Sequence, residues 1–387
     1  MYYIGIDISK FKHDCAVIDG DGDVVTSSWS FGNDHEGFAL LKELLDALEG
    51  EKRIGFEATG HYGLNLKLFL ESNNFSFMEF NPVLVKRFIC GKSLRRTKND
   101  HLDSISIARY LETVEYKPYP KSFYHLDELK SLTRFRDSLV RQRSRQLVEL
   151  TNILDKTFPE FKPFFDGKLG VTAFYILDTY GSPDKISRMN AQSYEKIRKI
   201  SKGRFSAEKF AALKQLAKNT VGHPCDYLET EMKMVISLYS QFDAKVDELD
   251  EQIKAIVLKL NPPILTIPGI GFTSAAVILS EYGDISRFSG PSAMLSFAGL
   301  EPGYYQSGAS ESTGHMVKHG SSHLRYVLMN CCLPLIHSDP VFAEYYAKKR
   351  AEGKTHRVAM SHVAKKLVRV IYTLQVKNIP YDSTLIR

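Results

Sequence analysis

The chain has 387 residues, 43% of them hydrophobic and 25% charged, and a formal net charge of +6. This composition is typical of a soluble globular protein, and the length indicates two or three domains. No apolar run approaches the ~20 residues of a membrane span, and Met1 leads into a predicted strand instead of a signal peptide. We therefore exclude a membrane protein and expect a bacterial, cytoplasmic one, with its five irregularly spaced cysteines reduced.

Positive charge is concentrated in two stretches. Residues 84–98 contain six Lys or Arg and no acid, and residues 345–372 contain eight against one acid. Such clusters favour a polyanionic partner, because neutralised phosphates release counterions, although each cluster alone is equally consistent with a solvated surface. From the first stretch we select Arg95, Arg96 and Lys98 as candidate nucleic-acid contacts.

The N-terminal third alternates between strand and helix patterns. Period-two apolar runs predict strands over 2–8, 13–18, 24–29, 53–56 and 75–80, and a turn at 19–22 joins the second strand to the third. Helical periodicity predicts helices over 36–48, near 62–70, and beginning at about 82 and 100. Three antiparallel strands followed by this alternation indicate an α/β domain of the ribonuclease-H-like type over residues 1–125.

Four acidic residues stand at the ends of these elements. Asp7 and Glu57 end the first and fourth strands, which are neighbours in this topology, and Asp100 and Asp103 are three apart on a predicted helix. Gathered carboxylates repel one another unless a cation neutralises them. The four acids therefore predict a divalent metal site and phosphoryl transfer.

The middle of the chain reads as helical. Residues 126–155 form an amphipathic pattern that opens a helical linker or insertion over 126–225, whose later part is weakly patterned. Residues 226–261 repeat apolar side chains three and four apart from Leu228 to Leu260, which predicts a long coiled-coil helix. Its partner is either an internal hairpin or a second chain. The pattern favours self-association, hence a homo-oligomer.

Residues 262–387 predict a mainly helical domain with two further motifs. The turn Leu265–Gly271 precedes an Ala-rich helix and is similar to a helix-hairpin-helix phosphate contact, whereas its alternative is a plain connecting turn. The segment 299–325 is predicted as a loop rich in Gly and Ser, in which Gly308, Gly314 and Gly320 allow close approach to a ligand. Lys318 and Arg325 are charged donors suited to phosphate. From residue type alone, Ser307 is more often a turn residue than a nucleophile.

The ordered set of motifs resembles the bacterial transposases of the insertion sequence 110 family, to which Piv-type DNA invertases are related. The resemblance covers residues 1–160 and 260–375. The motifs that carry it are Ile4–Asp7, Phe56–Tyr62, Thr97–Asp103, Leu265–Gly271, Gln306–Gly308 and Gly314–Gly320.

This resemblance implies roles for the two groups of residues. The N-terminal domain would be similar to the RuvC resolvase, with Asp7, Glu57, Asp100 and Asp103 binding Mg²⁺. Ser307 would be the nucleophile that attacks a DNA phosphate. The chain departs from the family's Ser-Ser-Gly-Gly-Lys after Ser307, which leaves Ser310 and Ser312 as lesser candidates.

The resemblance also implies partners. These are double-stranded DNA at the element ends and target, a guide non-coding RNA encoded by the element, and further copies of the chain in a dimer or tetramer. The acids and the serine would then meet within one chain or across protomers, and the protein would associate with the nucleoid.

Three other functions compete with a transposase. A RuvC-like Holliday-junction resolvase or nuclease would use the acids with water and no serine. An actin-like sugar kinase is suggested by Ile4–Ser9, although no second phosphate motif or adenosine motif follows. A DNA-binding protein that has lost catalysis is the third alternative. DNA inversion, in place of transposition, is a further outcome of the same chemistry.

Overall fold

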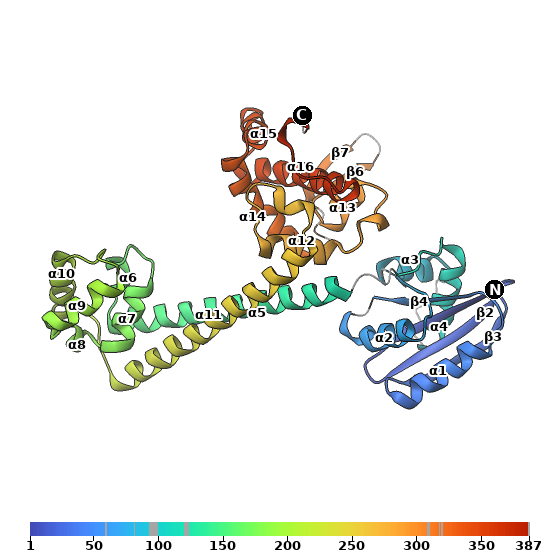
Figure 1. Cartoon of the computed structure of the whole chain (residues 1–387), viewed down its shortest axis with the longest axis horizontal. Helices are drawn as coiled ribbons and strands as arrows, with labels where there is room; N and C mark the ends of the chain where they lie inside the picture. Colours follow the sequence, from blue (N-terminus) through green and yellow to red (C-terminus); the bar gives the residue numbers. More distant parts are fainter. Residues whose placement is uncertain are drawn as a thin grey trace. The chain divides into compact units, whose positions relative to one another are not determined.

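A computed structural model describes residues 1–58, 60–80, 82–92, 100–119, 124–307, 310–316, 318 and 320–385. Within these, the side chains at 61, 83, 89, 91–92, 100–102, 124–125, 302–315 and 385 fall outside the description. The chain divides into two compact units, Met1–Ser122 and Phe123–Arg387. The first is mixed α/β and the second is largely helical (Figure 1).

The N-terminal unit is built on one five-stranded sheet with the order β3-β2-β1-β4-β5. The predicted order of strands and helices is confirmed. The strands are β1 (Tyr2–Ile8), β2 (Lys12–Asp19), β3 (Val24–Gly32), β4 (Lys52–Glu57) and β5 (Phe77–Phe80), and the helices are α1 (His35–Ala47), α2 (Leu64–Ser72), α3 (Pro82–Lys92) and α4 (Asp100–Thr113).

Each face of this sheet has its own hydrophobic cluster, because side chains alternate along a strand. Ile4, Ile6 and Ile54 pack with Leu41 and Leu45 of α1 and with residues of α2 on one face. Tyr3 and Phe80 pack with α4 on the other face, where residues of α3 also lie. Alternate strand residues therefore face α1 and α2, and the residues between them face α4.

The second unit is organised around two long antiparallel helices, α5 (Tyr124–Thr157) and α11 (Asp226–Leu260), which lie side by side (Figure 1). Arg136 Nε donates to Asp250 Oδ1 at 2.6 Å, and Arg143 pairs with Asp243 one or two turns further along. Leu139 of α5 packs between these pairs against Val246 and Leu249 of α11.

The heptads left two partners possible for α11, an internal helix or a second chain. The structure shows the internal one, α5. The buried seam of α11 includes Ile236 and Val257, whereas Leu260, expected in the seam, is 39% exposed. Since α5 of the same chain covers much of the seam, the heptads alone no longer indicate a second chain, and self-association stays a prediction.

A helical cluster packs at one end of this pair. Leu154 of α5, Phe158 directly after it, and Leu228 and Met232 of α11 share a core with this cluster. Its helices are α6 (Phe161–Phe164), α7 (Val171–Tyr180), α8 (Pro183–Ser187), α9 (Ala191–Ile200) and α10 (Ala207–Lys218).

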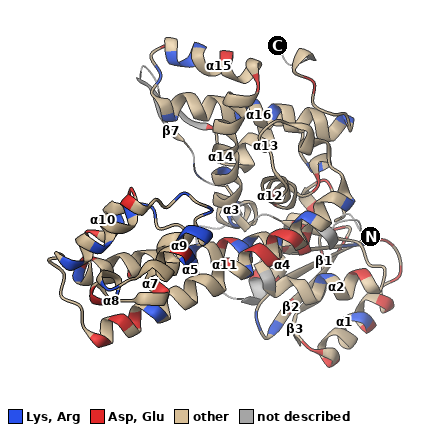
Figure 2. Ribbon diagram, turned by 60° about the vertical axis from the view of Figure 1, so that its left-hand side comes forward, with Lys and Arg blue, Asp and Glu red and all other residues tan. Residues whose placement is uncertain are grey.

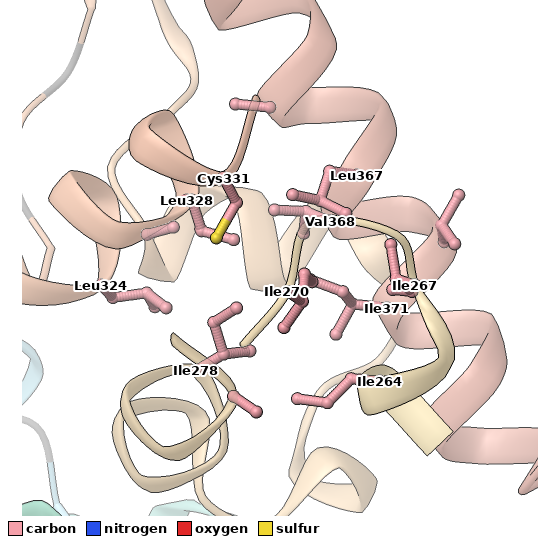
Figure 3. Close-up of a cluster of buried hydrophobic side chains, with 14 of the residues drawn as sticks. Ile264, Ile267, Ile270, Ile278, Leu324, Leu328, Cys331, Leu367, Val368 and Ile371 are labelled. Atoms are coloured by element: carbon pink, nitrogen blue, oxygen red, sulfur yellow. The ribbon is translucent and has the colours of Figure 1, made fainter. Parts of the chain in front are cut away.

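The C-terminal helices pack at the other end of the pair, where Leu129 of α5 and Ile253 and Val257 of α11 enter the largest core. Figure 3 shows Ile264, Ile267 and Ile270 of the predicted turn pointing into this core toward Ile371. The helices are α12 (Phe272–Tyr282), α13 (Pro291–Phe297), α14 (Ser322–Ser338), α15 (Pro340–Ala351) and α16 (His356–Lys377).

The segment predicted as a Gly- and Ser-rich loop is not simply a loop. It contains an antiparallel hairpin of β6 (Pro302–Ser307) and β7 (Ser310–Met316). The absence of apolar periodicity was misleading, because a hairpin can be formed by Tyr, Thr and Ser without an apolar stripe.

Among the described residues, no helix is long and apolar enough to cross a membrane.

Candidate active site

The ends of β1 and β4 lie beside each other, as the topology predicted. The two strands are parallel, and their last registered pair is Ile6 with Phe56. Asp7 and Glu57 are the next residues on each strand, so they stand on neighbouring strands about 4.8 Å apart. Because Ile6 and Phe56 belong to the cluster beneath α1 and α2, Asp7 and Glu57 face the α4 side of the sheet.

Two glycines allow α4 to lie directly on that side of the sheet. Gly5 and Gly55 are register partners. A Cβ on Gly5 would fall 2.2 Å from the Ser104 carbonyl oxygen, and one on Gly55 would fall 2.6 Å from the Phe80 ring. Both distances are too short for any side chain, so glycine is required. Ser104 Oγ also hydrogen-bonds Ser28 Oγ of β3 at 2.8 Å, which fixes α4 along the sheet.

This packing brings Asp103 to the two strand-end acids. Asp103 precedes Ser104, the residue that lies over Gly5. Burial, together with the negative charge of Asp103, raises the pKa of Glu57 above its usual value. The two carboxyls are therefore close enough to repel each other.

A fifth acid, Asp14 of β2, lies next to Asp7 and was not predicted from the sequence. It is the antiparallel partner of Asp7, so the two side chains share the α4 face with Cβ atoms about 5 Å apart. Asp14 is only 2% exposed, accepts a hydrogen bond from Ser30, and lies 3.5 Å from Lys12 Nζ. The sequence contained a signal for this pairing. Asp7 and Asp14 are equally far from the turn between the predicted strands 2–8 and 13–18, so antiparallel pairing of these strands makes them partners.

The fourth predicted acid, Asp100, is the first residue of α4. Its side chain is outside the described residues, so its distance to the other acids is left open. Among the side chains that are described, no group of three His, Cys, Asp or Glu is close enough to hold a metal ion.

Ser307 belongs to the second unit, where it is the last residue of β6 and the register partner of Ser310. Ser312, the other lesser candidate, pairs with Tyr305 on the same hairpin. The side chains of all three serines are outside the description.

The predicted phosphate contacts have different outcomes. Lys318 is exposed, whereas Arg325 is half-buried at the start of α14 and its Nη1 donates to the Ala298 carbonyl oxygen at 3.3 Å. Gly320 closely approaches the chain itself, since a Cβ there would meet the Phe297 carbonyl oxygen at 1.9 Å. Arg95, Arg96 and Lys98 lie outside the described residues.

The turn at Leu265–Gly271, which was predicted to contact phosphate, packs closely against α14. Gly269 has a φ of +83°, and a Cβ on it would be 2.8 Å from Pro334 Cβ of α14. Gly271 is the N-cap of α12 and has no side chain to cap it, which leaves the first N–H groups of this helix without a side-chain acceptor from the cap residue.

Comparison with known proteins connects the two units to one family. Residues 4–159 match the DEDD domain of IS110-type transposases, and residues 261–347 match the transposase family IS116/IS110/IS902. An uncharacterized 43.6 kDa protein of insertion element IS110 from Streptomyces coelicolor is 24% identical over 67% of this chain and 65% of its own length.

Two further relatives align over nearly the whole chain. An uncharacterized protein of insertion element IS116 from Streptomyces clavuligerus is 23% identical over 96% of this chain and 94% of its own. The pilin gene-inverting protein of Moraxella lacunata is 24% identical over 99% and 98%. The first match ends just after α5, and the acids at the sheet edge lie inside it. The second covers the start of the C-terminal helices and the hairpin. The two matches thus name the same family, and the chain belongs to the IS110 family of transposases.

Proposed function

We propose that this protein is a DNA transposase of an insertion sequence that cuts and rejoins strands through a covalent serine intermediate. The observation that carries the proposal is that burial and the negative charge of Asp103 raise the pKa of Glu57, which stands beside Asp7 at the end of the neighbouring strand. Carboxylates assembled at such a cost are suited to a divalent cation and phosphoryl transfer.

The sheet order supports a ribonuclease-H-like, RuvC-like N-terminal domain. Three antiparallel strands continue into two parallel ones, and the acids stand on the central pair. The family membership supports the same assignment. For the second unit we propose three domains. Residues 126–225 form a helical insertion, 226–261 the coiled-coil helix, and 262–387 the transposase domain with a helix-hairpin-helix-like turn.

The residues present fit Mg²⁺, because the donor set is all oxygen and crowded with negative charge. Asp7, Glu57, Asp103 and Asp100 would hold the ion. When bound, Mg²⁺ would supply stabilisation of negative charge on the phosphate being transferred. Asp14, on the neighbouring strand, would add negative charge beside Asp7.

Ser307 is the proposed nucleophile. Its Oγ would attack the phosphorus of a DNA phosphodiester and lose its proton, while the bond from phosphorus to the leaving sugar oxygen breaks and that oxygen gains a proton. The resulting phosphoserine keeps the energy of the broken linkage. A second strand's hydroxyl would then attack the same phosphorus and release Ser307, so the strands are joined without hydrolysis.

Partners follow from the family and from charge. We propose double-stranded DNA at the element ends and target, a guide non-coding RNA, and a dimer or tetramer of the chain. Lys318 is an exposed cation, and we keep it with Arg95, Arg96, Lys98 and Arg325 as candidates for phosphate contact.

The test is to incubate the protein with Mg²⁺ and DNA carrying the element ends, and to detect protein covalently attached to DNA on a denaturing gel. We expect an adduct from the wild type that is absent from Ser307→Ala and from Asp7→Asn, and present in Ser312→Ala. An adduct in Ser307→Ala would move the nucleophile elsewhere. Strand exchange by Ser307→Ala without any adduct would favour a resolvase or nuclease that uses water.

A further inference from the structure

The helical cluster α6–α10, for which the sequence suggested no role, carries an unusual charge. Residues 185–218 contain ten Lys or Arg and two acids, so this short stretch has a larger positive charge than the +6 of the whole chain. Figure 2 shows Lys and Arg on α9 and α10. Positive charges at this density repel one another and lower the stability of the fold, and binding of an anionic partner would offset that cost.

Some of these cations are already neutralised and serve the fold. Lys185 Nζ lies 2.6 Å from Glu229, Arg198 lies 3.9 Å from Glu195, and the Lys214 ammonium donates to the Met189 carbonyl oxygen. These contacts join the short helices to one another and to α11. They account for the half-buried or paired members of the set.

Of the seven other cations in this stretch, five line one face, and with Lys168 they form what we call the α9 basic surface: Lys168, Lys196, Lys199, Lys202, Arg204 and Lys209. Two adjoining hollows are lined by these side chains, the first also by Arg198 and the acid Glu195, and Lys202 lines both, so the six belong to one continuous face. Lys196, Lys199, Lys202, Arg204 and Lys209 are exposed. Across the described part of the chain, none of these five has an acidic side chain within ion-pair distance.

The chemistry of this face is that of a contact to backbone phosphates. Lysine predominates, which gives point charges and not the bidentate fork that reads base edges. The aromatic residues of the cluster pair with one another, as in Tyr194–Phe210 and Phe165–Phe205, and the second pair also lines the second hollow, so the lysines and not the rings favour a duplex. These features fit a double helix bound without sequence preference.

The position of the α9 basic surface along α11 indicates where a bound DNA duplex would lie. The α6–α10 core packs on α11 at Met232, and the C-terminal core packs on it at Ile253. The intervening residues of one straight helix span roughly 30 Å, about the length of one turn of B-DNA.

We propose that the α9 basic surface binds the phosphates of double-stranded DNA that flanks the reacting site, about one helical turn from where the C-terminal helices contact the same duplex. This rests on the proposed function only in that DNA is the substrate. The surface would contribute affinity and not chemistry.

The experiment compares the full-length wild type with the triple variant Lys196→Gln, Lys199→Gln, Lys202→Gln. A control variant with the same net charge carries Lys42→Gln, Lys52→Gln and Lys117→Gln in the N-terminal unit, where Lys42 and Lys117 pair with Asp46 and Glu115. Binding to a ~40-base-pair DNA duplex is measured over a range of salt concentrations. Melting temperature verifies that each variant is folded.

We expect the triple variant to bind about 10-fold or more weakly, and the slope of log affinity against log salt to fall by about 0.9 for each lost phosphate contact, while the control keeps wild-type values. DNA footprinting should show the protected region shortened by about one helical turn. Equal weakening of both variants, or none in the triple variant, would overturn the proposal. Weakening only toward an RNA duplex of the same length would overturn the assignment to DNA.

The covalent adduct separates this inference from the proposed function. On a short substrate that ends before the flank, the triple variant should form adduct like the wild type. If the wild type forms no adduct although the triple variant binds DNA weakly, the proposed chemistry fails and the surface assignment stands.

Discussion

Glu57 occupies a position that costs stability in the absence of a cation. Its carboxyl is half-buried at the end of β4, and the negative charge of Asp103 lies close to it. Burial and repulsion both oppose the ionised form, so the pKa of Glu57 is raised. A side chain kept in such surroundings contributes to function and not to folding, since a neutral residue would fit the same place at lower cost.

We therefore predict that Glu57→Gln raises the melting temperature of the metal-free protein by a few degrees and abolishes the DNA adduct. The amide keeps the shape of the carboxyl and removes its charge, which relieves about 1 kcal/mol of unfavourable interaction. Scanning calorimetry without and with Mg²⁺ measures the melting temperature, and the denaturing-gel assay measures the adduct. Glu43→Gln, an exposed change on α1, should alter neither property. A marked fall in melting temperature for Glu57→Gln would contradict the argument.

Asp14 gives a second prediction at this scale. Asp14→Asn should leave the fold intact, because the amide oxygen can still accept from Ser30. Removing its charge opposite Asp7 should weaken divalent-ion affinity about 10-fold, as for partners that orient a ligand. Titration with Mn²⁺ followed by thermal shift measures this, with Asp21→Asn in the β2–β3 turn as the control. Unchanged affinity would restrict Asp14 to a structural role.

The strand-end acids could be predicted from the sequence, because apolar runs that end in Asp7 and Glu57 fix both their strands and their neighbouring positions. Asp14 could have been found only by pairing β1 with β2 residue by residue. The contact of Asp103 with Glu57 required knowing how closely α4 approaches the sheet, and that depends on Gly5 and Gly55, whose significance is visible only in three dimensions.

At the scale of elements, the contact of α4 with the sheet depends on Gly5. A methyl group there would overlap the Ser104 carbonyl oxygen and the Ala108 nitrogen, at 2.2 and 2.4 Å, and both are backbone atoms that cannot rotate away. We predict that Gly5→Ala destabilises the N-terminal unit by about 2–4 kcal/mol and weakens metal binding, because α4 must lift together with Asp103.

Chemical denaturation followed by circular dichroism measures this loss. Gly20→Ala is the matched control in the same unit, since the nearest atom to a Cβ there is 3.8 Å away, at ordinary contact distance. Equal stability of the two variants would mean that α4 lies further from β1 than described.

Glu281 has the same importance for the packing of the second unit. Arg134 of α5 donates to Glu281 through Nε and Nη2 at 2.8 and 3.1 Å, and the Glu281 side chain is only 2% exposed. Burial favours the neutral form, but hydrogen bonds from Arg134 and Ser321 and nearby positive charge outweigh it and lower the pKa of Glu281. The ionised form thus joins α5, α12 and the cap of α14.

The sign of the pH effect follows from a lowered pKa. The stability that Glu281 contributes is present above the unfolded pKa and is lost as the pH falls through the lower, folded value. We predict that Glu281→Gln costs about 2 kcal/mol at pH 7, less than for a fully buried pair because Arg134 is half exposed, and flattens the loss of stability below about pH 4.5. Glu248→Gln, in an exposed pair, should change stability by under about 0.5 kcal/mol. Parallel pH profiles for wild type and Glu281→Gln would contradict this.

Elements were predicted unevenly for identifiable reasons. Periodicity located α5 and α11 to within about two residues, because long amphipathic helices repeat their pattern many times. It could not say that they pack on each other, since an apolar stripe does not name its partner. The β6–β7 hairpin escaped prediction because its strands are short and polar, with neither period to detect.

At the scale of the whole molecule, the two units have separate hydrophobic cores: the sheet clusters in Met1–Ser122 and the helical clusters in Phe123–Arg387. The acids that we propose as metal ligands are all in the first unit. A ligand that binds only folded protein stabilises the part to which it binds, by RT ln(1 + [L]/Kd).

We therefore predict two calorimetric transitions, of which Mg²⁺ raises only the one from the N-terminal unit. At a Mg²⁺ concentration 100 times its dissociation constant, that unit should gain about 2.7 kcal/mol, a shift of several degrees. Glu57→Gln and Glu281→Gln assign the transitions, because each changes a different unit. Asp7→Asn should abolish the Mg²⁺ shift while leaving both transitions. If Mg²⁺ moved the transition that Glu281→Gln lowers, the ion would bind outside the sheet edge, and the carboxylates of β1, β4 and α4 would not be its site.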